Sequence, residues 1–134
     1  MTIEEIFNLR QGTGGLHNLL DVHTVRLDEQ GRVAVDLNVT EHVLNPHGKA
    51  HGGTLFALCD IAVGSYAALK KIQAVTIDSS IHFYRAGLPG TVLTAVVNER
   101  KLGRTTSVFL VETHDDKGNH IADATFTMYC AKPL

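Results

Sequence analysis

The segment Asn45–Gly53, followed by a lone Asp60, holds the residues whose types and spacing could do chemistry. It contains an amide side chain, two imidazoles and three glycines directly before an apolar run, and Asp60 lies inside that run. A charged group in an apolar environment costs free energy unless it has a specific partner or role. A helix start rich in donors, paired with a buried acid, points to hydrolysis or proton transfer on a carbonyl compound.

Gly52 is the residue of this segment that could polarise a carbonyl group. Backbone N–H groups at a helix N-terminus are unpaired and lie at the positive end of the helix dipole, so they stabilise charge that develops on oxygen. A glycine also lets a substrate approach the backbone closely. The simpler alternative is that Gly52 and Gly53 only permit a tight turn into the helix.

The elements that must position these residues follow from periodicity. A short amphipathic helix is expected at 2–10, then a Gly-rich break at Gly12, Gly14 and Gly15, an extended segment at 16–27 and a half-buried strand at 33–40. A long helix, apolar on all sides and therefore buried, is expected at about 53–71. Runs rich in Val, Ile, Thr and Phe, separated by turn residues, predict four more strands, at 75–84, 91–101, 105–114 and 121–131.

This order predicts an α+β fold in which about six antiparallel strands curl around one long helix. The 134 residues fit a single domain over 1–134, with 1–14 as an N-terminal helix and Gly-rich lead-in. The face of the helix or sheet that remains uncovered would require a second subunit.

Composition excludes several classes of partner. The net charge is −2 and the longest basic run is Lys70-Lys71, so we expect no nucleic-acid partner. The apolar stretch 54–69 is short and interrupted by polar residues, so we expect no membrane span. The N-terminus lacks the basic start of a secretion signal, and Cys59 and Cys130 are interpreted as buried thiols in a reducing cytoplasm, although a disulfide between them is an alternative.

The chain resembles the hotdog-fold acyl-CoA thioesterases of the PaaI-type, phenylacetate-pathway branch. The motif that carries the resemblance is Asn45-x-x-Gly48-x-x-His51-Gly52-Gly53 with Asp60. Further matches are the segments 76–78, 83–85, 103–105 and 118–124, so the resemblance covers residues 15–132. Two departures are Ala86-Gly87, where the family often has a proline after the arginine, and Val43, where it often has a histidine.

The resemblance implies hydrolysis of an acyl-CoA to a carboxylic acid and free coenzyme A, with no separate cofactor because coenzyme A is part of the substrate. It implies that Asp60 acts as general base or nucleophile and that the Gly52 N–H polarises the thioester carbonyl. Supporting roles fall on Asn45, His51 and Thr76. Candidate contacts to substrate or coenzyme A are Gly53, Tyr84, Arg85, Lys101 and Arg104.

A distance argument divides the motif between two sites. Gly52 and Asp60 are separated by about 12 Å along one helix, whereas reacting groups must lie within about 3–3.5 Å of a shared centre. Two antiparallel copies of the helix, related by a two-fold axis, could bring Gly52 of one chain to Asp60 of the other. We therefore expect a homodimer or a dimer of dimers, as in the family, and an inactive monomer.

Several alternatives stay open. The fold could serve a hydratase or dehydratase, or a non-catalytic acyl-CoA-binding module. His47 and His51 are four residues apart, but Gly48 between them argues against a helical metal-ligand pair, so no metal is expected. The simpler interpretation is that Asn45 is only a turn residue and that Lys101 and Arg104 are solvated charges in a turn. The acyl pocket is expected to be lined by residues near Leu55, Cys59 and Val63 and by the opposing chain.

Overall fold

The computed structural model describes residues 1–11 and 15–133 of the chain. The elements in chain order are α1 (Ile3–Gln11), α2 (Leu16–Leu19), β1 (Val22–Leu27), β2 (Val33–Asn38), the 3-10 helix η1 (Glu41–Val43), α3 (Gly52–Leu69), β3 (Ile72–Phe83), β4 (Val92–Leu102), β5 (Thr106–Asp115) and β6 (His120–Pro133). The long helix and all six strands were predicted from the sequence, with ends that differ by a few residues.

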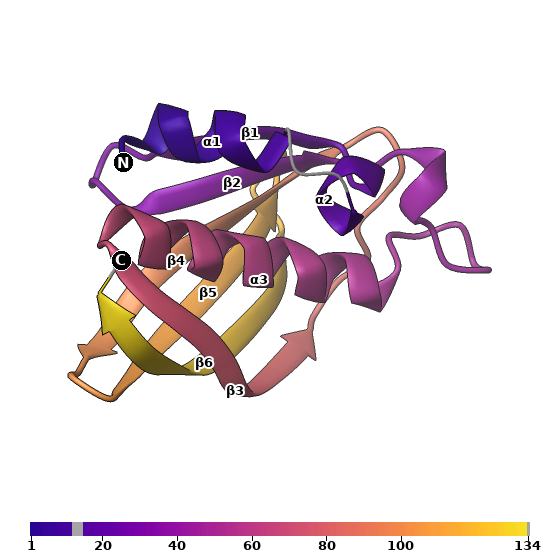
Figure 1. The fold of residues 1–134 in the computed structure, drawn as a ribbon. Helices are drawn as coiled ribbons and strands as arrows, with labels where there is room; N and C mark the ends of the chain where they lie inside the picture. Colours follow the sequence, from indigo (N-terminus) through magenta and orange to yellow (C-terminus); the bar gives the residue numbers. More distant parts are fainter. Residues whose placement is uncertain (12–14, 134) are drawn as a thin grey trace.

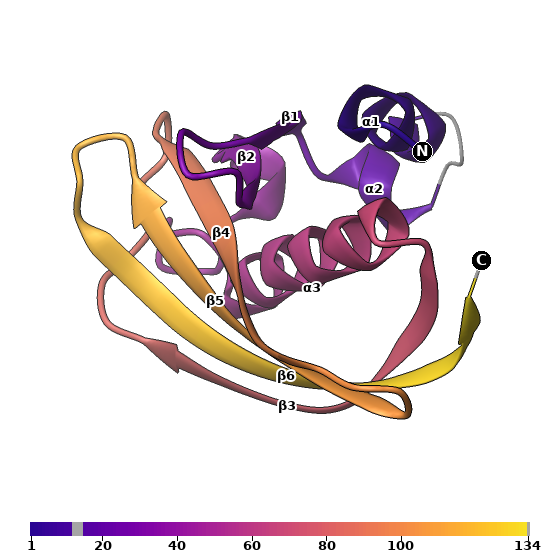
Figure 2. The ribbon, with the colours of Figure 1, turned by 90° about the vertical axis from the view of Figure 1, so that its left-hand side faces the viewer.

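The strands form one antiparallel sheet that curls around α3 (Figures 1 and 2). The strand order is β1-β2-β4-β5-β6-β3, so β1 and β3 are the two edges. The chain leaves the sheet after β2, builds α3 against its concave face and returns as the opposite edge strand. This arrangement confirms the predicted α+β architecture.

The core lies between α3 and the concave face of the sheet. Alternate residues of β5, among them Phe109 and Val111, are buried there because side chains of a strand point to opposite faces in turn. Phe126 of β6 is fully buried as well, and α3 contributes Leu58 and Val63 to the same cluster.

Helix α1, predicted at residues 2–10, packs against β1 and α3. Thr2 and Glu5 form a capping box, in which the Glu5 N–H donates to Thr2 Oγ1 at 3.1 Å and the Thr2 N–H donates to Glu5 Oε2 at 3.3 Å. Ile6 is buried on the side of α1 that packs against β1 and α3. Of the predicted Gly-rich lead-in, Gly12 and Gly14 lie outside the described residues, and Gly15 has a positive φ of 68°.

Two local predictions were wrong. Residues 16–19 were expected to be extended but form the short helix α2, and the strand begins only at Val22. Strand β2 was expected to be half-buried, yet its outer-face residue Asp36 is buried too. Three side chains cover that carboxylate and hydrogen-bond to it, namely those of Thr24, Arg26 and Thr94.

Helix α3 is buried on most sides, as expected, and it keeps one uncovered side. Gly53, Phe56 and Asp60 are exposed and Gly64 is half-buried, at the spacing of one helical face. Asp60 is therefore not a buried charge within the protomer, contrary to the expectation. By length and composition α3 is apolar enough to cross a membrane. However, the sheet curls around it (Figure 2), so α3 is the core helix of this fold.

Candidate active site

The start of α3 is shaped by His51, which is the N-cap residue of the helix. Its Nδ1 atom accepts a hydrogen bond from the Gly53 N–H at 2.8 Å, and its carbonyl oxygen accepts from the Thr54 N–H at 2.8 Å. The His51 N–H itself donates to the Val43 carbonyl oxygen. His51 therefore orients the loop and the helix start, and its Nδ1 atom is not available to pair with His47 around a metal ion.

The Gly52 N–H is the donor that remains at this helix start. Within the described part of the chain, no acceptor is recorded for it, whereas the N–H groups on either side are both bonded. Gly52 also lies against the ring of Phe83, and a Cβ atom at position 52 would meet Phe83 Cζ at 3.3 Å. A substrate carbonyl near Gly52 would thus find an unpaired donor beside an aromatic ring.

A hollow of about 430 Å³ opens at this donor end of α3. Gly52 and Leu55 line it from the helix, Phe83 and Tyr84 from the end of β3, and the cationic side chains of Lys49 and Arg85 from the adjoining loops. The two loops are joined by a hydrogen bond from the Ala50 N–H to the Gly87 carbonyl oxygen at 2.8 Å. We call this the donor-end hollow.

Asn45 lines the donor-end hollow, but its side-chain oxygen is already engaged. Asn45 Oδ1 accepts hydrogen bonds from the His47 N–H at 3.0 Å and the Lys49 N–H at 3.1 Å. This is the turn geometry typical of Asn before Pro. Only the amide NH₂ group of Asn45 could therefore contact a substrate carbonyl.

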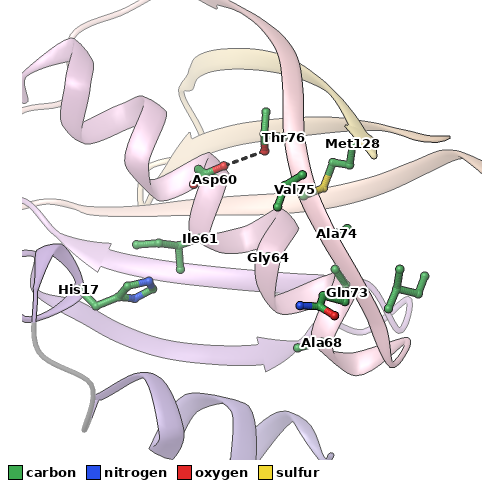
Figure 3. A pocket seen from close by; sticks show the side chains of 12 residues that line it. His17, Asp60, Ile61, Gly64, Ala68, Gln73, Ala74, Val75, Thr76 and Met128 are labelled. Atoms are coloured by element: carbon green, nitrogen blue, oxygen red, sulfur yellow. Dashed lines mark hydrogen bonds between the residues drawn. The ribbon is translucent and has the colours of Figure 1, made fainter. Parts of the chain in front are cut away.

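Asp60 and Thr76 meet at a second hollow of about 460 Å³ (Figure 3). Thr76 Oγ1 donates a hydrogen bond to Asp60 Oδ1 at 3.2 Å, so the carboxylate of α3 is tied to the edge strand β3. His17 of α2 and Gln73 of β3 line the same space. We call this the acid-end hollow.

The two hollows have no lining residue in common. Gly52 belongs to one and Asp60 to the other, on the same helix and about 12 Å apart by the helical rise. The separation that the sequence predicted is thus a property of the folded protomer. Neither hollow alone contains both a carbonyl-polarising donor and an acid.

Other predicted site residues are not brought together. Lys101 and Arg104 lie at the β4–β5 hairpin and line neither hollow. Gly53 lines a third, largely apolar hollow of about 410 Å³ together with His51. Their contacts to substrate or coenzyme A remain sequence predictions.

Two of the three residues near which the acyl pocket is expected do not reach the surface of the protomer. Cys59 and Val63 are fully buried in the core between α3 and the sheet, and of the three residues expected there only Leu55 lines one of the two hollows on α3. Burial raises the pKa of the Cys59 thiol to about 11. Cys59 is therefore a core residue rather than a reactive one.

Sequence reasoning missed Lys49, Phe83 and His17 as lining residues. In the sequence, Lys49 stands only within the motif and Phe83 only within a segment that matches the family. His17 lies in the segment that was expected to be extended. Each reaches its hollow through tertiary contacts between segments that are distant in the sequence, for which the sequence contains no periodic signal.

Comparison with known proteins identifies the family and the fold of this chain. Residues 47–122 match the family described as the thioesterase superfamily, and the chain belongs to that family. It is 33% identical over 103 residues to the acyl-coenzyme A thioesterase PaaI of Escherichia coli, covering 77% of this chain and 73% of that protein. The fold is the hotdog fold, and the predicted resemblance is confirmed.

Two solved structures from streptococci are also similar. A hypothetical thioesterase of Streptococcus pneumoniae, solved with coenzyme A, is 36% identical with a TM-score of 0.76, over 85% of this chain and 90% of that one. A Streptococcus mutans protein bound to acetyl-CoA is 33% identical with the same TM-score and the same coverage. The pneumococcal protein was also solved with a threonine or an aspartate, sixteen positions apart, replaced by alanine.

Proposed function

We propose that this protein hydrolyses acyl-CoA thioesters at two equivalent sites of a homodimer. Each site combines Gly52 of one protomer with Asp60 and Thr76 of the other. The observation that carries the proposal is the separation of the unpaired Gly52 N–H from the Asp60–Thr76 pair along α3. A two-fold axis across antiparallel copies of α3 would join each donor end to an acid end.

In this proposal each of Gly52, Asp60 and Thr76 has one role in thioester hydrolysis. The Gly52 N–H polarises the thioester carbonyl and stabilises the negative charge that forms on its oxygen. Asp60 either removes a proton from the attacking water or attacks the carbonyl carbon itself, and Thr76 holds the carboxylate in position. The C–S bond breaks and coenzyme A leaves as the thiol. If Asp60 acts as general base, the proton that it took from water passes to the thiolate, and the attacking water supplies the oxygen of the carboxylic acid. If Asp60 acts as nucleophile, water then hydrolyses the acyl–Asp60 anhydride, which frees the acid, regenerates Asp60 and supplies the proton for the thiolate.

The uncovered surface beside Asp60 supports the dimer. Strand β3 is a sheet edge, and its Val75 and Ile77 side chains are each 57% exposed. Phe56 is exposed on the neighbouring face of α3. An apolar edge strand next to an exposed apolar helix face is a surface that a second chain would cover.

The donor-end hollow suits the coenzyme A part of the substrate. Lys49 and Arg85 supply positive charge for phosphate groups, and Tyr84 supplies an exposed aromatic ring. The solved relative with coenzyme A supports this class of ligand. We assign Lys49 rather than Lys101 or Arg104 to these contacts.

The roles of Asp60 and Thr76 are supported by their spacing. They lie sixteen positions apart, as do the aspartate and threonine replaced in the pneumococcal relative. We further propose a cytoplasmic location, because Cys59 and Cys130 are both free thiols, as is usual in a reducing compartment.

The test is thiol release from a panel of aromatic and aliphatic acyl-CoAs. Asp60→Ala should lower kcat/KM at least a hundredfold, about 2.7 kcal/mol of transition-state stabilisation. Asp60→Asn keeps the size of the side chain and should lose as much. Equal rates in wild type and both variants would refute the role of Asp60, and hydration of a double bond without thiol release would refute the reaction.

A further inference from the structure

A cluster of polar side chains lies at the β5–β6 hairpin, and none of its members lines the donor-end or acid-end hollow. One ligand atom from each of Glu112, His114 and His120 lies within 4.8 Å of the other two, and all three residues are half-buried. Asp123 adjoins them on β6, with Oδ1 2.5 Å from His120 Nε2. The thioester hydrolysis proposed above uses none of these four side chains.

The strand register explains why they meet. His114 pairs with His120, and Glu112 pairs with Asp123. Residues directly opposite in an antiparallel pair point to the same face of the sheet. The two imidazole rings accordingly stack with centroids 4.6 Å apart. The same register sets Glu112 opposite Asp123, and like charges at opposite positions of an antiparallel pair are destabilising.

The cluster is held by neighbouring side chains. Tyr84 donates its hydroxyl hydrogen to Asp123 Oδ2 at 3.1 Å, and Asn98 Nδ2 donates to Glu112 Oε1 at 3.4 Å. A carboxylate that accepts a hydrogen bond from a histidine ring is the usual means of orienting a metal-binding imidazole. Asp123 stands in this relation to His120.

We propose that Glu112, His114 and His120 bind a divalent transition-metal ion of the Zn²⁺ class. Two imidazoles and one carboxylate are ligands that Zn²⁺, Co²⁺ and Ni²⁺ accept, whereas Mg²⁺ and Ca²⁺ prefer oxygen ligands alone. All three ligand atoms would have to lie about 2.0–2.2 Å from the ion, so the side chains would move to close onto it. The ion would offset the repulsion between Glu112 and Asp123 and join β5 to β6 on either side of the turn at 115–119.

The experiment is calorimetric titration of tag-free protein with Zn²⁺, and with Mg²⁺ as the comparison ion. The variants His114→Phe and His120→Phe keep a stacked ring pair but remove one ligand atom. The matched control is His23→Phe, because His23 is exposed on β1 at the edge of the sheet remote from β3. Glu112→Gln provides a further variant that removes a ligand charge without changing side-chain size.

Wild type and His23→Phe should bind one Zn²⁺ per chain and no Mg²⁺ at the same concentration. Each of the two cluster histidine variants should weaken Zn²⁺ binding at least a hundredfold while keeping the wild-type circular-dichroism spectrum, which shows that it is folded. Co²⁺ should give a visible absorption band in wild type that is lost in these variants. The proposal is overturned if wild type binds no Zn²⁺, or if the cluster variants bind it as tightly as His23→Phe does.

Discussion

Thr76 Oγ1 donates a hydrogen bond to Asp60 Oδ1 across 3.2 Å, and this contact ties the edge strand β3 to the uncovered side of α3. The carboxylate is exposed in the protomer, so its position depends on this bond rather than on burial. A carboxylate that is exposed and held by one hydrogen bond remains accessible to a substrate bound at Gly52 of a second subunit.

Replacing Thr76 tests whether this bond positions the acid. Thr76→Val keeps the shape of the side chain and removes the hydroxyl, so kcat should fall about tenfold, the value of one hydrogen bond to a charged group. Thr76→Ser keeps the hydroxyl and should retain most of the activity. Thiol-release kinetics measure both. Equal activity in the Val and Ser variants would contradict a role for the hydroxyl.

Gly52→Pro tests the donor directly. Position 52 is the first residue of α3, where proline is well tolerated because its missing N–H has no partner within the helix. His51 already has the extended backbone that a residue before proline prefers, with φ −61° and ψ 140°. We expect kcat to fall about 10²–10³-fold, as when an oxyanion donor is removed.

Gly52→Ala is the matched control for that variant. It adds the same Cβ contact with Phe83, 3.3 Å from Cζ, but keeps the N–H. Its kcat should stay well above that of Gly52→Pro. If the alanine and proline variants are equally impaired, the steric contact rather than the lost donor is responsible, and the assignment of Gly52 is wrong.

Asp36 gives a prediction about acid stability. Burial raises the pKa of this carboxyl group, but hydrogen bonds from Arg26, Thr24 and Thr94 outweigh it and hold the pKa below the usual 3.8. The charged form is thus favoured in the folded state, so the stabilisation is present above pH 3.8 and is lost as the pH falls through the lower, folded-state value.

Urea unfolding of wild type and Asp36→Asn measures that effect. At pH 7 the variant should be about 2 kcal/mol less stable, because charge-assisted hydrogen bonds are lost. The difference should shrink as the pH is lowered below about 4, where the unfolded wild-type carboxyl group becomes protonated. A difference that is constant down to the acid transition would show that the charge of Asp36 does not stabilise the fold.

The fold could be predicted because its strands and its helix have different periods. Val33, Val35 and Leu37 alternate as a strand requires, and the helix follows a cap residue and a glycine pair. Helix α2 was missed because four residues, Leu16–Leu19, are too few to carry a period. The burial of Asp36 was missed because it arises from partners on two other strands.

The candidate site could be predicted only where the motif is local. The sequence indicated Gly52 and Asp60, and the helical rise showed that one chain cannot unite them. The exposure of Asp60 was not foreseen, because Phe56 and the glycines on its side of α3 count as apolar in a periodicity argument. Lys49 joins the hollow through the contact of Ala50 with Gly87, which no local pattern encodes.

The central claim is that each active site is shared between two chains, and subunit complementation tests it most directly. Asp60→Asn and Gly52→Pro chains carrying different affinity tags would be co-expressed, and the heterodimer isolated by two successive affinity steps. One of its two sites would then combine an intact Gly52 with an intact Asp60, while the other would lack both.

The account predicts that this heterodimer releases thiol at about half the wild-type rate per dimer, although either homodimer is nearly inactive. If each site were built within a single chain, every site of the heterodimer would lack one essential group. A heterodimer no more active than the two homodimers would therefore contradict the shared site.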